Sequence, residues 1–433
     1  MDLRPNSPGA TGIRQIHVHL VAVLMLTLLP PRVLTMDDAL RLFRENGFDL
    51  LIAEAQVAAA QGDAEMATAI ANPQLSAAVG KSFGYDSAAC PGCSATAWSI
   101  GITDPSALSD LLTGKRGLRV EVARAALAAA RRSRDDALRL LSLQVRQAML
   151  DGALQQAQLD LAREVSDAAE RTRALDEKRV QAGAISEAEL ARADVAALQA
   201  QQAVDLAAQA VRASRLQIAL LLGSREPEAE FTVDPDLLDR ALPAEGADAD
   251  ALAREALDRR PDLRAALAQE TRAESALALA RRQRIPDVAL SAQYQQEGSG
   301  QSALQPPTLT VGAQLPLPIF YRQSGEIARA EAELRAQRTS EAKLRAQVLV
   351  EVQSARTAVE ANRRLVERMR SRMLGRARRV RDLVQVQYEK GAASLLELLD
   401  AQRTWAQTRS EYFRGLRDLW LSIFQLDAAI GRT

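Results

Sequence analysis

Gly183-Ala184-Ile185-Ser186 returns later in the chain as Gly391-Ala392-Ala393-Ser394, and Leu222-Gly223 returns as Ile430-Gly431. In both cases the two copies lie 208 residues apart. Independent loops would have no reason to keep one spacing over such a distance, whereas a duplicated structural unit keeps it. The sequence therefore predicts a fold built from two copies of one unit.

The duplication extends beyond these turns. Residues 125–133 correspond to residues 332–340, and the strand-like run that begins at Asn72-Pro73 corresponds to the run that begins at Ile285-Pro286. We therefore expect each half to contain a helix, two short strands, a very long helix, a turn and a final helix. The predicted organisation is a signal peptide at 1–34, a first repeat at 35–223, a linker rich in proline and acidic residues at 224–248, and a second repeat at 249–433.

The composition is typical of long helices. Aromatic residues make up only 3% of the 433 residues, which is low for packed cores in a chain of this length. Alanine, leucine, arginine, glutamate and glutamine dominate instead. The 55 lysines and arginines balance the 55 aspartates and glutamates. The net charge therefore gives no indication of binding to nucleic acid or to an anionic membrane.

The prolines leave two zones free for long helices, because proline lacks the N–H that a helix interior needs. None occurs from Ser106 to Glu226 or from Ile319 to the last residue. A helix from 326 to 388 would be roughly 90 to 100 Å long at ~1.5 Å per residue. We expect the turns at 183 and 391 to fold each long helix back as an antiparallel coiled-coil hairpin. The predicted buried stripe of the second zone is Leu344, Val348, Val352, Ala355, Val359, Val366, Met369 and Met373.

Residues 74–85 alternate between an apolar face and a face of small and polar residues. The same period of two occurs in residues 95–104, 288–295 and 308–315. A half-buried strand of a soluble sandwich shows this period too, but four strands in two distant hairpins make a marginal sheet in water. A barrel closed between several chains, with its apolar face toward lipid and its polar face toward a lumen, accounts for both features.

The N-terminus has the layout of a secretory signal. Arg4 and Arg14 precede an apolar run from Leu20 to Leu29 that is too short to span a bilayer as a helix. The alternative is an apolar N-terminal helix, because residues 30–35 contain no small-x-small cleavage site. No other long apolar run occurs, which excludes a helical inner-membrane transporter.

From about Leu34 onward the chain resembles the outer-membrane efflux proteins of the TolC type, which are trimeric channels of tripartite export systems. Two stretches, Thr113–Gly117 and Pro316–Ile327, are most similar to the heavy-metal-cation branch typified by CzcC. The resemblance implies a mainly α protein with a membrane β-barrel. Three chains would each give four strands to a twelve-stranded outer-membrane barrel and two helical hairpins to a trimeric periplasmic α-barrel.

The resemblance also implies roles for residues near the hairpin tips. Glu397 and Asp400 match an acidic pair whose rings line the pore constriction. Such rings of like charge favour cations at a narrow passage. The alternative is a solvated helix face, because residues three apart are neighbours on a helix. The tip residues expected to contact a periplasmic adaptor protein are Gly183, Ser186, Gly391 and Ser394.

A gate is implied close to the second tip. Tyr388 matches the gate tyrosine of the family, and Glu189 matches its acidic partner on the neighbouring hairpin. Ala393 departs from an arginine of the family pattern. One link of the gating network is therefore absent or replaced.

The implied function is the passive exit duct of a tripartite efflux system with a periplasmic adaptor and an inner-membrane pump of the RND type. The expected cargo is divalent heavy-metal cations, with drugs or other small molecules as the alternative. A soluble coiled-coil protein would not explain the strands, and an adaptor would have one helical hairpin rather than two. We expect the protein in the outer membrane of a Gram-negative bacterium, in contact with its lipid.

Enzymatic chemistry has no support in the sequence. Gly114-Lys115 fails as a P-loop, because Ser109 replaces the first glycine and Arg116 replaces the Ser/Thr. The only histidines, His17 and His19, lie in the predicted signal peptide. We expect no cofactor and no resident metal.

Two further motifs allow several interpretations. Cys90-Pro91-Gly92-Cys93 can be a redox pair, half of a zinc site or a tight disulfide, and export favours a disulfide between Cys90 and Cys93. The arginine-rich residues 368–381 could suggest nucleic acid, but no aromatic residue is interleaved with them. We expect a solvated or adaptor-facing helix surface there and no nucleic-acid partner.

Overall fold

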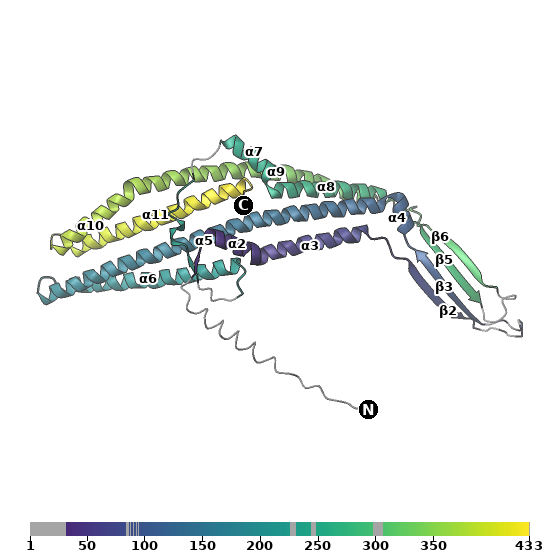
Figure 1. Cartoon of the computed structure of the whole chain (residues 1–433), viewed down its shortest axis with the longest axis horizontal. Helices are drawn as coiled ribbons and strands as arrows, with labels where there is room; N and C mark the ends of the chain where they lie inside the picture. Colours follow the sequence, from purple (N-terminus) through teal and green to yellow (C-terminus); the bar gives the residue numbers. More distant parts are fainter. Residues whose placement is uncertain are drawn as a thin grey trace, which may run out of the picture.

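The protein is an elongated helical rod that carries a β-sheet at one end (Figure 1). A computed structural model describes residues 32–83, 86, 88–89, 91, 93, 95–225, 231–243, 248–297 and 306–432. The long helices run side by side along the rod, and both helical hairpins turn at the end opposite the sheet. No described helix combines the length and the apolar composition that crossing a bilayer requires.

Both halves of the described chain share one order of elements, except that the first has the short helix α4 before its long helix and the second has its long helix divided by η3. Each half has two helices ahead of its strands where one was expected, because Gly47 and Arg260 adopt extended backbone and end the first helix. The first half contains α2 (Met36–Asn46), α3 (Phe48–Thr68), β2 (Gln74–Lys81), β3 (Thr96–Asp104), α4 (Ala107–Thr113), α5 (Lys115–Gln181) and α6 (Glu187–Leu221). The second contains α7 (Ala249–Arg259), α8 (Pro261–Arg282), β5 (Ala289–Glu297), β6 (Thr308–Gln314), α9 (Ser324–Arg368), the π-helical η3 (Met369–Leu374), α10 (Gly375–Glu389) and α11 (Leu395–Ala429).

The linker between the halves carries structure that the sequence did not predict. It contains β4 (Phe231–Val233) and the 3-10 helix η2 (Pro235–Leu237). β4 pairs in parallel with β1 (Arg32–Leu34), and Leu34 and Val233 are buried in the largest core cluster beside α5. β1 therefore uses the last three residues of the predicted signal peptide 1–34, whereas residues 1–31 lie outside the described part.

The four strands predicted from the alternation form one antiparallel sheet in the order β2-β3-β5-β6. β3 and β5 belong to different halves, and their pairing places Ile100 opposite Tyr294. The apolar face is uncovered in the single chain, where Val79 is 80% exposed and Val311 is 76% exposed. β2 and β6 are the edges of the described sheet.

The two hairpin turns are built by the same local chemistry. Gly183 and Gly391 adopt φ angles of 72° and 76°, a left-handed conformation that ends a helix at little cost for glycine. The N–H of the following residue then donates to a carbonyl of the preceding helix, with N···O distances of 2.8 Å from Ala184 and 2.7 Å from Ala392. The predicted antiparallel hairpins therefore have matching turns.

The long helix of the second half contains one residue more than its counterpart. Residues 125–133 and 332–340 correspond at an offset of 207, whereas the tips correspond at 208. The structure accommodates the extra residue in η3, where a wider π turn replaces α-helical turns, and the helix bends ahead of α10 (Figure 1). The predicted stripe is broken there: Met369 is buried, but Met373 is 41% exposed. The prediction of a core role for Met373 was wrong because the π turn rotates it away from the packed face.

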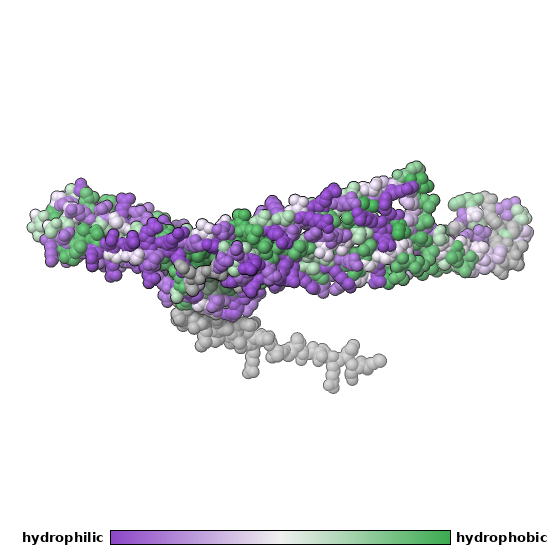
Figure 2. All heavy atoms as spheres, turned by 90° about the horizontal axis from the view of Figure 1, so that it is seen from above, coloured by the Kyte–Doolittle hydropathy of each residue, from purple (hydrophilic) through white to green (hydrophobic). Residues whose placement is uncertain are grey.

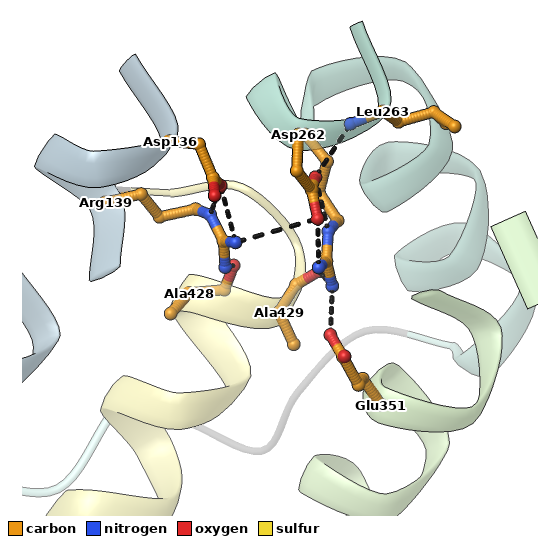
Figure 3. A network of polar contacts seen from close by, with 8 residues as sticks. Asp136, Arg139, Asp262, Leu263, Glu351, Ala428 and Ala429 are labelled. Carbon is orange, nitrogen blue, oxygen red and sulfur yellow. Dashed lines mark hydrogen bonds and ion pairs between the residues drawn. The ribbon is translucent and has the colours of Figure 1, made fainter. Parts of the chain in front are cut away.

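A buried charge network joins the two halves near the middle of the rod (Figure 3). Arg139 of α5 donates to Asp136 at 2.6 Å and to the carbonyl of Ala428 at 2.8 Å. Arg260, at the start of α8, donates to Asp262 at 2.6 Å and to Glu351 of α9 at 2.5 Å.

The same network holds the end of α11. Arg260 also donates to the carbonyl of Ala429 at 3.3 Å, so both arginines bind carbonyls at the C-terminal end of α11, where helical partners run out. Burial alone would lower the pKa of Arg260, but the hydrogen bonds with Asp262 and Glu351 raise it above its ordinary value. Arg260 therefore stays charged and ties α8, α9 and α11 together.

We predict that Arg260→Ala lowers the stability of the folded chain by about 3 kcal/mol, the usual cost of removing one partner from a buried ion pair. Thermal unfolding of the purified protein, followed by far-ultraviolet circular dichroism, measures the effect. Arg264→Ala is the control, because Arg264 is exposed one turn further along α8. Equal loss in the two variants would contradict the role assigned to Arg260.

Candidate functional site

The hairpin tips present the predicted adaptor-contact residues to solvent. Gly183, Ser186, Gly391 and Ser394 are all exposed. Both serines are N-caps of complete capping boxes, one at the start of α6 and one at the start of α11. In a capping box the serine and the glutamate three residues later satisfy each other's backbone N–H groups. The two tips are therefore fixed in the same way.

Glu397 is the capping glutamate of α11. Its carboxylate accepts the backbone N–H of Ser394 at 2.7 Å and the hydroxyl of Ser394 at 2.9 Å. The backbone N–H and then the hydroxyl of Ser394 lower the pKa of Glu397 below its ordinary value. The side chain is exposed, so the cap holds an ionised carboxylate at the surface beside the tip.

The acidic pair is confined to the second hairpin. Asp400 lies one turn after Glu397 on α11 and is also exposed. The corresponding residues of the first hairpin are Glu189, which caps α6, and Arg192. At these two equivalent positions, therefore, the second hairpin has two carboxylates and the first has a carboxylate and a guanidinium.

Tyr388 is buried at the end of α10. It is 4% exposed and packs against Ala193, Leu395 and Leu398. Its hydroxyl donates to Asp176 Oδ1 on α5 at 2.5 Å, whereas Glu189 accepts the backbone N–H of Ser186 at 3.1 Å. Within the chain the hydroxyl of Tyr388 therefore binds Asp176, while the capping box engages the Glu189 carboxylate. The pairing of Tyr388 with Glu189 of a neighbouring hairpin stays a prediction.

Asp176 is fully buried, and its Oδ2 has no hydrogen-bond partner among the described residues. Arg179 lies one turn further along α5, with its guanidinium 3.6 Å from Asp176 Oδ1 and 4.8 Å from the centre of the Tyr388 ring. It also donates to the carbonyl of Tyr388 at 2.8 Å. Arg179 thus supplies a cation beside Tyr388, in a hairpin where Ala393 lacks the arginine of the family pattern.

This arrangement raises the pKa of Tyr388 above its ordinary value, first through burial and then through the hydrogen bond to Asp176. The phenol therefore remains protonated and keeps donating to the carboxylate. The sequence carried a weak signal for this site: Asp176 and Arg179 lie in the last two turns before the Gly183 turn, but they resemble the other charged residues of α5.

Two further ties join α5 to the second hairpin above the tip. Glu164 forms ion pairs with Arg381 of α10 and Arg409 of α11. The two guanidiniums lie 4.9 and 5.6 Å from the centre of the Trp405 ring, distances at which a cation is attracted to an indole. Nearer the middle of the rod, Asp151 accepts from Arg417. The contact between Tyr388 and Asp176 is thus the one nearest the tip in a series of contacts between α5 and the second hairpin.

The cysteine pair stays a prediction. Cys93 is disulfide-bonded, but its predicted partner Cys90 lies outside the described residues. Within the described part of the chain, no three histidine, cysteine, aspartate or glutamate side chains gather closely enough to hold a metal ion.

The geometry of duplicated hairpins and an exposed apolar sheet agrees with a known family. Residues 39–224 and 252–432 match the family described as outer membrane efflux protein. The chain belongs to this family. It is an outer-membrane efflux channel with a periplasmic helical extension, and channels of this family transport solutes rather than catalyse reactions.

Other outer membrane efflux proteins show how far the likeness extends. The chain is 25% identical over 411 residues to the cobalt-zinc-cadmium resistance protein CzcC of Cupriavidus metallidurans, which covers 92% of this chain and 90% of CzcC. The CmeC outer membrane channel of Campylobacter jejuni has a TM-score of 0.75 at 15% identity, with 92% and 85% coverage. The structure of CusC has a TM-score of 0.73 at 21% identity, with 92% coverage of both chains. These structural likenesses establish the fold.

We predict that Tyr388→Phe favours an open tip, because it leaves the buried Asp176 with one hydrogen bond fewer. Loss of one such bond costs about 1 to 2 kcal/mol, which shifts a two-state equilibrium roughly tenfold. Single-channel recording in planar bilayers measures the open fraction. Tyr412→Phe on α11 is the control, because its hydroxyl makes no hydrogen bond among the described residues. An unchanged open fraction for Tyr388→Phe would show that this bond does not hold the tip closed.

Proposed function

We propose that three copies of the chain assemble into one channel. The support comes from the sheet, whose edge strands β2 and β6 lack partners in the single chain. Unpaired backbone groups are costly in lipid, so a membrane sheet has to close on itself. β6 of one copy would pair with β2 of the next, and twelve strands in all would form the barrel.

In this assembly the hairpins form the wall of a periplasmic tunnel. The exposed tips at Gly183 and Gly391 would contact a periplasmic adaptor, which links the channel to an inner-membrane pump of the RND type. Tyr388, Asp176 and Arg179 would act as the gate, because they hold the second hairpin against α5. The channel would then be a passive exit duct that opens when the adaptor separates the two hairpins.

We propose divalent heavy-metal cations as the cargo. The observation that carries this proposal is the pair of exposed carboxylates, Glu397 and Asp400, beside the tip of the second hairpin. Three-fold symmetry would turn the pair into two acidic rings, which attract cations at a constriction. The likeness to a cobalt-zinc-cadmium resistance protein gives further support.

We predict that Glu397→Gln with Asp400→Asn abolishes block by divalent cations in planar-bilayer recordings and lowers cation selectivity. Gln keeps an acceptor for the N–H of Ser394, so the helix start is preserved while the charge is removed. Glu189→Gln is the matched control, because it changes the same position of the other capping box. Divalent block that persists in the double variant would rule out the acidic rings as the cation site, and drugs or other small molecules would become the preferred cargo.

The lowered pKa of Glu397 predicts how the block depends on pH. In an Asp400→Asn channel, Glu397 is the remaining carboxylate of the pair. We expect block to persist as the pH falls through 4.5, the ordinary value for glutamate, and to disappear only at lower pH. The stabilising contribution of the capping box depends on pH in the same way. It is present above the ordinary pKa of glutamate and is lost as the pH falls through the lowered pKa of Glu397. Loss of block already above pH 4.5 would contradict this assignment.

A further inference from the structure

The border between the helices and the sheet exposes a group of large apolar side chains. They belong to α4 and to residues 315–321, which connect β6 to α9; we call these two segments the collar. Its most exposed members are Leu111, Leu112, Leu317, Ile319 and Phe320, and Phe320 is 100% exposed. Figure 2 shows hydrophobic side chains gathered at this end of the helical part, next to the strands.

α4 is oriented opposite to a helix on the surface of a water-soluble protein. Its polar residues Ser109 and Asp110 are 5% and 4% exposed, and Asp110 pairs with Arg119 at 2.6 Å. Its leucines face outward instead. Such a helix is stable only if its outer surroundings are apolar.

The second segment of the collar continues the lipid-facing pattern of β6. Leu309 and Val311 lie on the apolar face of the strand, and the period of two continues beyond the strand end at Gln314 through Leu315, Leu317 and Ile319. Prolines occupy the intervening positions 316 and 318. The collar is therefore continuous with the sheet face that contacts lipid.

Hydrogen bonds hold the collar segment 315–321 in a defined conformation. The hydroxyl of Tyr321 donates to Glu326 at 2.6 Å and accepts the N–H of Gly325 at 2.9 Å. A Cβ at position 325 would lie 2.5 Å from that hydroxyl, so glycine permits the close approach. The fold thus fixes the loop while leaving Phe320 outside.

The strands alone fall short of the usual apolar band. The four strands have seven to nine residues. At ~3.3 Å per residue and a tilt of about 40° they give roughly 18 to 23 Å of height, whereas an outer-membrane barrel has an apolar band of about 25 Å. Exposed arginines at 282, 284 and 322 lie on the helical side of the collar, where headgroups of a bilayer would be. This order of apolar, aromatic and basic residues is typical of a membrane interface.

We propose that the collar is a lipid-binding surface that inserts into the periplasmic leaflet of the outer membrane. It extends the apolar band below the sheet and fixes the depth and the angle of the rod. The ligand is a phospholipid, which the collar contacts through its headgroup and the part of its acyl chains next to the headgroup.

The test uses the full channel reconstituted in vesicles of phosphatidylethanolamine and phosphatidylglycerol, with or without acyl chains brominated close to the headgroup. Phe320→Trp is made in a Trp98→Phe background, so that Trp405 and Trp420 on the rod are the remaining tryptophans. We expect the added fluorescence to be blue-shifted and to lose intensity in the brominated vesicles. Leu112→Trp in the same background is expected to behave alike and checks the result from the other segment of the collar.

Val380→Trp is the matched control, because Val380 is an exposed apolar residue of α10 far from the sheet. It should emit at longer wavelength and keep its intensity. Blue-shifted emission without quenching at positions 320 and 112 would mean that a neighbouring chain covers the collar. Red-shifted emission without quenching would mean that it faces water. Either result would overturn the proposal.

Discussion

In lipid every backbone N–H and C=O of a strand has to be paired, and this requirement shapes the rest of the molecule. In the described part of the chain, the sheet β2-β3-β5-β6 has an uncovered apolar face and two free edges, so it is stable in a membrane only as part of a larger closed structure. β3 and β5 pair across the two repeats, which fixes both long hairpins to one sheet. The sheet therefore sets the orientation of the helical rod relative to the membrane. The proposed collar would add a second membrane contact that maintains this orientation.

The duplication gives the two hairpins the same turns and caps, so their differences show where function has diverged. Three of the differences bear on the tip and its charge: the extra residue in η3, Asp400 where the first repeat has Arg192, and Tyr388 where it has Val180. Two of the three lie within ten residues of the Gly391 turn. The π turn lies further up the same hairpin and changes the rotation of everything beyond it. The second hairpin thus carries the acidic pair and Tyr388, whereas α5 is an unbroken helix that supplies Asp176 and Arg179.

Features set by neighbouring residues could be predicted from the sequence. The glycine turns, the serine caps and the period of the strands depend on local backbone geometry, and each has a recognisable pattern. Features that depend on contacts between the two hairpins could not be predicted from the sequence. The contact of Tyr388 with Asp176 was not predicted, because Asp176 is distant in sequence and looks like any other acidic residue of a charged helix. The three-residue strand β4 was missed because so short a segment has no period, and the exposure of Met373 followed from a one-residue offset that only the comparison of both repeats shows.

The three ties between α5 and the second hairpin, at Asp151, Glu164 and Asp176, are spaced by 12 or 13 residues but differ in burial. The side chains of Asp151 and Glu164 are 38% and 42% exposed, whereas that of Asp176 is fully buried. Exposed ion pairs contribute little and exchange readily with water. A buried carboxylate with one unpaired oxygen loses hydration when the tip closes and regains it when the tip opens. At the tip, the contacts that Tyr388 and Arg179 make with Asp176 therefore oppose the tendency of the Asp176 carboxylate to regain hydration. In the proposed gate, this balance would allow a modest force at the tips to open the channel while the ties above it keep the hairpins aligned.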